Sequence, residues 1–140
     1  MAVADVNEII IAYLVVNADI IAFFAPTLPR IYCPRLPENA ELPAAGLFVR
    51  GGSSTPYIPG ILNPNFQIDC WDNNPIGARA LYRTIYSSLQ GIQNITVTVD
   101  GSDYLIMSAI EEVQGQDLQD IDVPTYYRVL ALFSIMIRAE

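Results

Sequence analysis

Residues 125–138, TYYRVLALFSIMIR, form the stretch that decides the fold class of this chain. Successive side chains of a strand point to opposite faces of a sheet, so this stretch divides into two faces. The first face would present Tyr127, Val129, Ala131, Phe133, Ile135 and Ile137. The second face would present Tyr126, Arg128, Leu130, Leu132, Ser134 and Met136. An antiparallel sheet usually keeps one face in water. Because both faces are largely apolar here, we predict one long closing strand that is covered on both sides.

The residues before this strand predict a β-hairpin. Residues 95–99 and 104–113 flank Asp100-Gly101, a dipeptide typical of two-residue hairpin turns. The second hairpin strand is apolar on both faces, with Leu105, Met107 and Ala109 on one and Tyr104, Ile106 and Ile110 on the other. A polar, acidic loop is expected over residues 114–123.

Three helical segments are expected nearer the N-terminus. Asp5 has a glutamate three residues later, a capping pattern that predicts a helix to about residue 16. A shorter helical piece is expected over 19–24. Asn74 followed by Pro75 predicts the start of a helix that reaches residue 89. Extended pieces are expected over 30–33, 46–50 and 66–71, with a long loop over 51–63.

These elements predict a single α+β domain over residues 1–140. Its sheet would be mainly antiparallel and four- to five-stranded, with the N-terminal helix and one central helix packed on one face. Two helices of this length can cover one face of such a sheet but hardly both. A neighbouring subunit is the simplest cover for the second face, and the alternative is that the long loops fold over it. The interface candidates are Leu130, Leu132 and Met136 of the closing strand and Tyr57, Ile58, Ile61 and Leu62 of the long loop.

The composition also favours a covered surface and excludes several classes of partner. Charged residues make up 16% of the 140 residues, against a usual share of about 25%. The net charge is −8, with seven arginines and no lysine or histidine. An acidic chain lacks the cationic surface that binds nucleic-acid backbones or anionic membranes. No stretch reaches the ~20 apolar residues of a membrane span, and no basic residue precedes Arg30 to make a signal peptide, so we expect synthesis in the cytoplasm.

No catalytic arrangement is recognisable. Ser53 and Ser54 have no histidine or lysine to act as a base. Glu111 and Glu112 are neighbours in an expected strand, so their carboxylates would point to opposite faces. Cys33 and Cys70 have no metal-binding spacing and are expected to be reduced core thiols. We therefore expect a protein that is not an enzyme and that has no cofactor.

One acidic loop could in principle collect a cation. It carries Asp117, Asp120 and Asp122 but lacks the glycine and the final glutamate of an EF-hand loop. A solvated acidic loop is therefore the favoured interpretation, and no metal site is predicted.

Several stretches, taken in order, resemble the tail-completion proteins of long-tailed bacteriophages, also called tail terminators or head–tail joining proteins. The stretches are Arg30-Ile31-Tyr32 with Pro34, Leu42-Pro43 leading into Leu47-Phe48-Val49, residues 66–71 (FQIDCW) leading into the helix over 78–89, and Tyr127-Arg128-Val129 after the hairpin. The resemblance covers nearly the whole chain, and the order and spacing of the stretches carry it. Cys33 and the absence of lysine depart from the usual pattern of the family.

The resemblance implies a small α+β domain whose copies form a ring, usually a hexamer, that caps the finished tail tube. The implied partners are the major tail-tube protein and a head-completion or connector protein. DNA would pass through the ring without specific binding, and Asp117, Asp120 and Asp122 would face the lumen or the tube. The implied location is the tail or neck of the virion. Another neck or minor tail component is the alternative of the same class, and a small-ligand or peptide-binding module is the alternative of a different class.

Overall fold

The computed structural model describes residues 5–25, 27–33, 43–54, 61–119 and 127–139 and has an α+β fold. The elements in chain order are α1 (Val6–Val15), α2 (Ala18–Phe24), β1 (Ile31–Tyr32), β2 (Ala44–Ser54), β3 (Ile61–Asp72), α3 (Pro75–Leu89), β4 (Gln93–Val99), β5 (Ser102–Gln119) and β6 (Tyr127–Ala139). The predicted α+β class is therefore confirmed.

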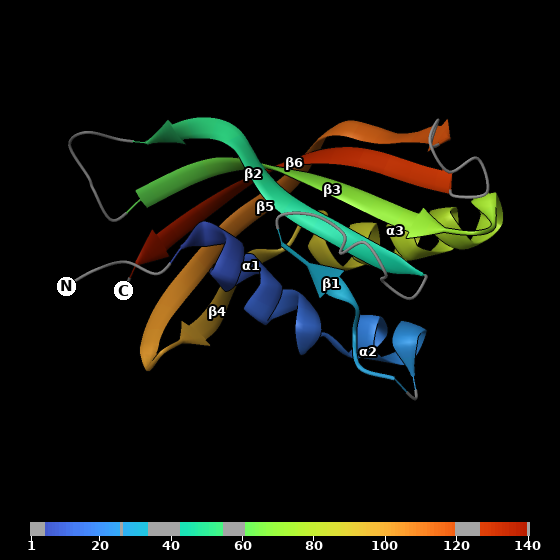
Figure 1. Cartoon of the computed structure of the whole chain (residues 1–140). Coiled ribbons are helices and arrows are strands. Elements are labelled where there is room, and N and C mark those ends of the chain that lie inside the picture. The colour runs from blue at the N-terminus through green and yellow to red at the C-terminus, as the bar shows by residue number, and fades with distance from the viewer. Residues whose placement is uncertain (1–4, 26, 34–42, 55–60, 120–126, 140) are drawn as a thin grey trace.

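The strands form one curled sheet in the order β1-β2-β3-β6-β5-β4 (Figure 1). Neighbouring strands are antiparallel except for the pair β1 and β2, which is parallel. The predicted count of four to five strands was too low, because the two-residue β1 adds a sixth strand and makes the sheet mixed. The closing strand β6 lies near the middle of the sheet, between β3 and β5, so both of its edges are paired.

Each of the three helices begins after a polar residue whose side chain caps its N-terminus. Asp5 accepts a hydrogen bond from the backbone N–H of Asn7, and Asn74 accepts one from Ile76. Asn17 caps α2 by accepting from two backbone N–H groups, so it begins the second helix as well as following the first. These bonds satisfy backbone donors that a helix leaves unpaired at its start, typically worth about 1 kcal/mol each.

The predicted hairpin is confirmed, and its turn has the expected backbone. Asp100 and Gly101 both have positive φ, 52° and 80°, between Val99 and Ser102, which are register partners. A two-residue turn with positive φ at both positions matches the twist of the strands that it joins. This turn fixes the register of β4 against β5.

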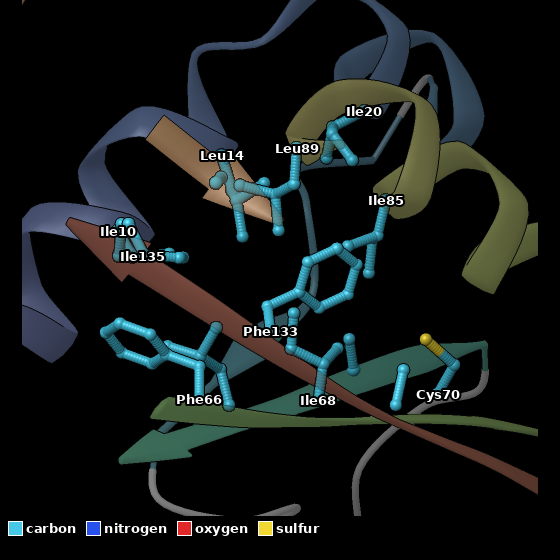
Figure 2. Packing of buried hydrophobic residues seen from close by; sticks show 14 of the residues in the cluster. Ile10, Leu14, Ile20, Phe66, Ile68, Cys70, Ile85, Leu89, Phe133 and Ile135 are labelled. Carbon is cyan, nitrogen blue, oxygen red and sulfur yellow. The ribbon is translucent and has the colours of Figure 1, made fainter. Parts of the chain in front are cut away.

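The three helices lie on the same side of the sheet, and the core fills the space between the two layers (Figure 1). In Figure 2, Phe133 of β6 points from its strand toward Ile85 of α3, while Phe66 of β3 lies farther along the sheet, on the side of Ile10 of α1. Both phenylalanine side chains are fully buried. Burial of this apolar layer is the main stabilising contribution to the fold.

Bulges in β5 change which of its side chains face the core. Between Ile106 and Ser108 the register against β6 shifts by one residue, so Ala109 lies opposite Ile135. Ala109 is fully buried, whereas Ile110 is 56% exposed. The expected grouping of Ala109 with Leu105, and of Ile110 with Ile106, was therefore wrong, because an extra residue in a strand inverts the side-chain alternation that follows it.

Two segments that were expected to be loops are partly strand. β5 continues through residues 114–119, where Gln116 pairs with Leu130 and Asp117 with Val129. β2 and β3 likewise extend to Ser54 and back to Ile61. The polar residues 114–119 and the pair Gly51-Gly52 have weak strand propensity, and pairing with a long neighbouring strand overrides it.

Candidate interface on the uncovered sheet face

The sheet face opposite the three helices, called the open face below, is covered by no described helix (Figure 1). The alternation predicted for β6 is confirmed: Val129, Ala131 and Phe133 are buried under the helices. Leu130, Leu132 and Met136 point the other way and are only half-buried. The half-exposed Ile110 also belongs to the open face, because it lies opposite Ser134 of β6. An apolar strip therefore runs along β6 and onto β5.

The neighbouring strand β3 adds a polar strip to the same face. Asn65, Gln67 and Asp69 lie directly opposite Ser134, Leu132 and Leu130 of β6. Gln67 and Asp69 are only 6% and 8% exposed although no described helix covers them. The flanking side chains on β2 and β6 enclose them, since Phe48 is the partner of Gln67 on β2 and Leu132 its partner on β6.

The buried polar groups of this strip are connected by hydrogen bonds. Arg50 donates from Nη1 to Oε1 of Gln67 at 2.8 Å. Gln67 donates from Nε2 to the two carboxylate oxygens of Asp69 at 3.3 and 3.2 Å. Buried polar groups are costly when unpaired, so this chain of bonds lets Gln67 and Asp69 remain inside an otherwise apolar face.

Asp69 is the electrostatic centre of this network. Burial raises the pKa of the Asp69 carboxyl, and the nearby Arg128, the Gln67 hydrogen bond and Arg50 oppose that rise. Arg128 also lies over the Trp71 ring, with 5.2 Å from its guanidinium carbon to the ring centroid. The open face thus combines apolar side chains with a carboxylate and two guanidinium groups that are already held in place. Aromatic residues and arginine are enriched in protein–protein interfaces, whereas aspartate is depleted there.

Sequence reasoning missed the parts of this face that β2 and β3 contribute. The sequence predicts a strand over residues 66–71 but no interface role for Gln67 or Asp69, nor for Arg50. Their one sequence signal is the polar alternation within FQIDCW, but a polar residue on a solvated strand gives the same signal. The register against β6, which cannot be read from the sequence, makes these groups neighbours of Leu130 and Leu132.

A polar depression of about 400 Å³ adjoins the open face. Its lining consists of Gly52, Asn63, Asn65, Glu112 and Ser134. Glu112 is exposed there, whereas the carboxylate of Glu111 lies on the helix side and accepts a hydrogen bond from Tyr82. The expectation that these two carboxylates point to opposite faces is confirmed.

The helix side of β5 carries a compact network of its own. The Tyr82 hydroxyl donates to Oε2 of Glu111 at 2.5 Å and accepts from the backbone N–H of Gly115 at 3.2 Å. Burial and the Glu111 carboxylate raise the pKa of Tyr82. Arg79 donates to the Gly115 carbonyl and lies over the Tyr82 ring. This network fixes α3 against the bent part of β5, so we assign it to the fold.

The remaining interface candidates do not form one surface. Ile61 lies opposite Arg138, on the open face, but Leu62 lies opposite the buried Ile137 and so faces the helix side. The expected grouping of Ile61 with Leu62 is therefore wrong, because neighbouring residues in a strand face opposite sides. Tyr57 and Ile58 lie outside the described residues.

The expected acidic site is only partly described. Asp117 lies in β5 and forms an ion pair of 3.4 Å with Arg79, while its side chain stays largely exposed. Asp120 and Asp122 lie outside the described residues. Within residues 5–25, 27–33, 43–54, 61–119 and 127–139, no group of three or more metal-ligating side chains occurs.

The two cysteines are free thiols in different environments. Cys70 is fully buried, and burial raises its pKa far above the usual range of a thiol. Cys33 is exposed, so the expectation of two core thiols holds for Cys70 alone.

No single helix in the described part of the chain is long and apolar enough to span a membrane. α1 and α2 pass that test only together, as a pair bent by 71°.

No protein-family model matches the chain, and no curated protein matches it significantly in sequence.

Proposed function

We propose that this protein is a structural component of a long-tailed phage virion that forms a ring capping the tail tube and joining the tail to the head. The observation that carries the proposal is the open face of the sheet, with Leu130, Leu132, Met136 and Ile110 half-buried or exposed and no described helix over them. In the proposed ring, a second copy covers this face.

Physical considerations support a protein occupant for this face. Burying apolar surface against a partner stabilises the complex by roughly 25 cal/mol for each Å² removed from water. The buried pair Gln67 and Asp69 is already hydrogen-bonded, so covering it does not leave a polar group unpaired. A second copy could therefore bury the face without the usual cost of desolvating unpaired polar groups.

The place of the ring in a phage tail rests on the resemblance of the ordered stretches over residues 30–49, 66–89 and 127–129 to the tail-completion family. Its partners would be the major tail-tube protein on one side and a head-completion protein on the other. The net charge of −8 is compatible with a lumen through which DNA passes without binding, because like charges repel.

The first experiment is the native mass of the purified chain by light scattering on a sizing column, over a concentration series. The expected result is a discrete closed oligomer, about six times the 15.5 kDa chain mass for a hexamer. Cyclic symmetry produces such a discrete species, whereas non-specific association gives a continuous distribution of masses.

A matched pair of variants locates the contact. Leu130→Asp combined with Leu132→Asp places two charges on the open face and is expected to abolish the closed ring. Ile76→Asp changes a residue of α3 that is 78% exposed and is expected to leave the oligomer intact. A closed ring that survives the double substitution would assign the ring contact elsewhere.

A monomer at every concentration, with a melting temperature that shifts on ligand addition, would instead support a small-ligand or peptide-binding module. An open depression of about 480 Å³ lies between α2 and α3, lined in part by Phe23, Arg83 and Ser87. The native mass and the melting shift together separate the two hypotheses.

A further inference from the structure

The strand at one end of the sheet, β4, has a free edge among the described strands. The sheet ends there, with β5 as the neighbour of β4 on its inner side. Val99 and Ser102 flank the two-residue turn, and such flanking residues exchange backbone hydrogen bonds. Bonded and non-bonded pairs alternate along an antiparallel ladder, so Val97 and Ile95 also bond to β5. The backbone N–H and C=O groups of Thr96 and Thr98 therefore point outward, toward the free edge.

This edge lacks the features that normally prevent strand addition. Natural edge strands are protected by charged residues, prolines, bulges or short length. Residues 95–99, Ile-Thr-Val-Thr-Val, contain no charge and no proline, and their register against β5 is continuous. The opposite edge of the sheet is formed by β1, which has only two residues. The part of β2 beyond β1 and the part of β5 beyond β4 also lack a described neighbouring strand on one side, but both are interrupted by bulges, so β4 presents the regular edge that can accept a strand.

An apolar groove lies beside the same edge. It has a volume of about 470 Å³ between the C-terminal half of α1 and β4, and its lining contains no charged side chain. Val16, next to the end of α1, is 71% exposed and lines this groove together with Val15 and Ile95. A strand that paired with the outward groups of Thr96 and Thr98 would lie next to Val16 and cover part of this apolar surface.

We propose that the free edge of β4 pairs antiparallel with β4 of a second copy, across a twofold axis at Val97. In this register Thr96 of one copy lies opposite Thr98 of the other, and these residues carry the outward backbone groups. The same register places Ile95 opposite Val99 on the helix side, so the two apolar layers become continuous. Cross-strand pairs of threonines and of β-branched residues are favourable in sheets.

Charge favours this occupant and this orientation. Asp100 and Asp103, both exposed, lie at the turn end of β4. In the antiparallel register Asp100 of each copy lies opposite the uncharged Asn94 of the other, far from the acidic turn of the partner. A parallel pairing would place the two acidic turns side by side and is disfavoured by repulsion. Residues 95–99 of a second copy bring no charged side chain to this uncharged edge and groove, so the pairing buries no unpaired charge.

This contact is separate from the open face. A twofold contact is isologous and does not by itself close a six-membered ring. It joins two subunits edge to edge, whatever the open face binds, so the two interfaces can be tested independently of each other.

The test uses the full chain with Leu130→Asp and Leu132→Asp, so that the open face cannot contribute. Light scattering over a concentration series is expected to give a monomer–dimer equilibrium. Adding Thr96→Pro removes an outward N–H from each copy but no hydrogen bond to β5, and proline is tolerated on edge strands. The dimer dissociation constant is expected to rise at least tenfold.

A second variant guards against misfolding caused by proline. Thr96→Lys with Thr98→Lys keeps every backbone group but places like charges opposite each other across the axis, and it is also expected to abolish the dimer. Val97→Cys, in a chain that also has Cys33→Ser, is expected to form a disulfide-linked dimer on oxidation, because directly opposed strand residues have the required Cα separation.

The proposal is overturned by a monomer at every concentration, by a dimer that tolerates both edge variants, or by the absence of the Val97→Cys cross-link. The mass of the chain with Thr96→Lys and Thr98→Lys and an intact open face, in which β4 cannot pair, tests the ring separately. A failure of the ring and a failure of the β4 contact therefore give different results.

Discussion

The two faces of one strand, β6, differ in what surrounds them although their composition is similar. Phe133 is fully buried beneath the helices, whereas the adjacent Leu132 is half-buried on the open face. Both are large apolar residues in the same strand. The difference indicates that the helices bury one apolar face of β6. The other face is available for contact with a second protein chain.

The largest expected effect comes from truncating the covered face. Phe133→Ala is expected to lower the free energy of unfolding by about 3–5 kcal/mol, because it leaves a cavity in the packed layer seen in Figure 2. Leu132→Ala in the neighbouring position is expected to cost much less in a monomer and to weaken self-association instead. Urea denaturation of both variants in a chain that also carries Leu130→Asp, which places a charge on the open face, together with sizing of both in the wild-type background, measures the two effects. Equal losses of stability would remove the distinction between the faces.

An intermediate effect is expected from the polar network on the helix side. Tyr82→Phe removes a hydroxyl that joins Glu111 to the backbone of Gly115, and leaves both groups without that partner. The expected loss is about 1–3 kcal/mol, the usual cost of an unpaired buried polar group. Urea denaturation measures it, with Tyr86→Phe as the control that is expected to change little. A Tyr82 variant as stable as the control would show that water replaces the hydroxyl.

The smallest expected effect is a pH dependence on the open face. The pKa of Asp69 in the folded chain is raised, so the folded state holds this proton more tightly than the unfolded state. The stability that this provides is present at low pH and is lost as pH rises through the raised pKa. Asp69→Asn has no such titration.

The free energy of unfolding of the Asn variant, minus that of the wild type, is therefore expected to rise with pH from roughly 3.9, the ordinary aspartate value, and then to level off. Chemical denaturation across this pH range measures the difference. A difference that falls as pH rises would mean that Arg50 and Arg128 dominate over burial.

Local features were read correctly from the sequence because they depend on neighbours in the chain. The caps at Asp5 and Asn74 need only a side-chain oxygen next to an apolar helical run. The turn at Asp100-Gly101 needs only two residues that accept positive φ. The alternation of β6 follows from the period of a strand, and it identified Leu130, Leu132 and Met136 as residues of one face.

The tertiary structure alone decided what depends on residues distant in sequence. The bulge after Ile106, which exposes Ile110 and buries Ala109, arises from the pairing of β5 with β6 and leaves no local signal. The separation of Ile61 from Leu62, and the enclosure of Gln67 and Asp69 beside β6, depend on register in the same way. The sequence by itself determined the α+β class and the apolar faces of β6, because periodicity and capping act over a few residues. Which face the helices cover, and which polar groups join the open face, were decided by strand order and register, since these are set by the free energy of packing the whole sheet.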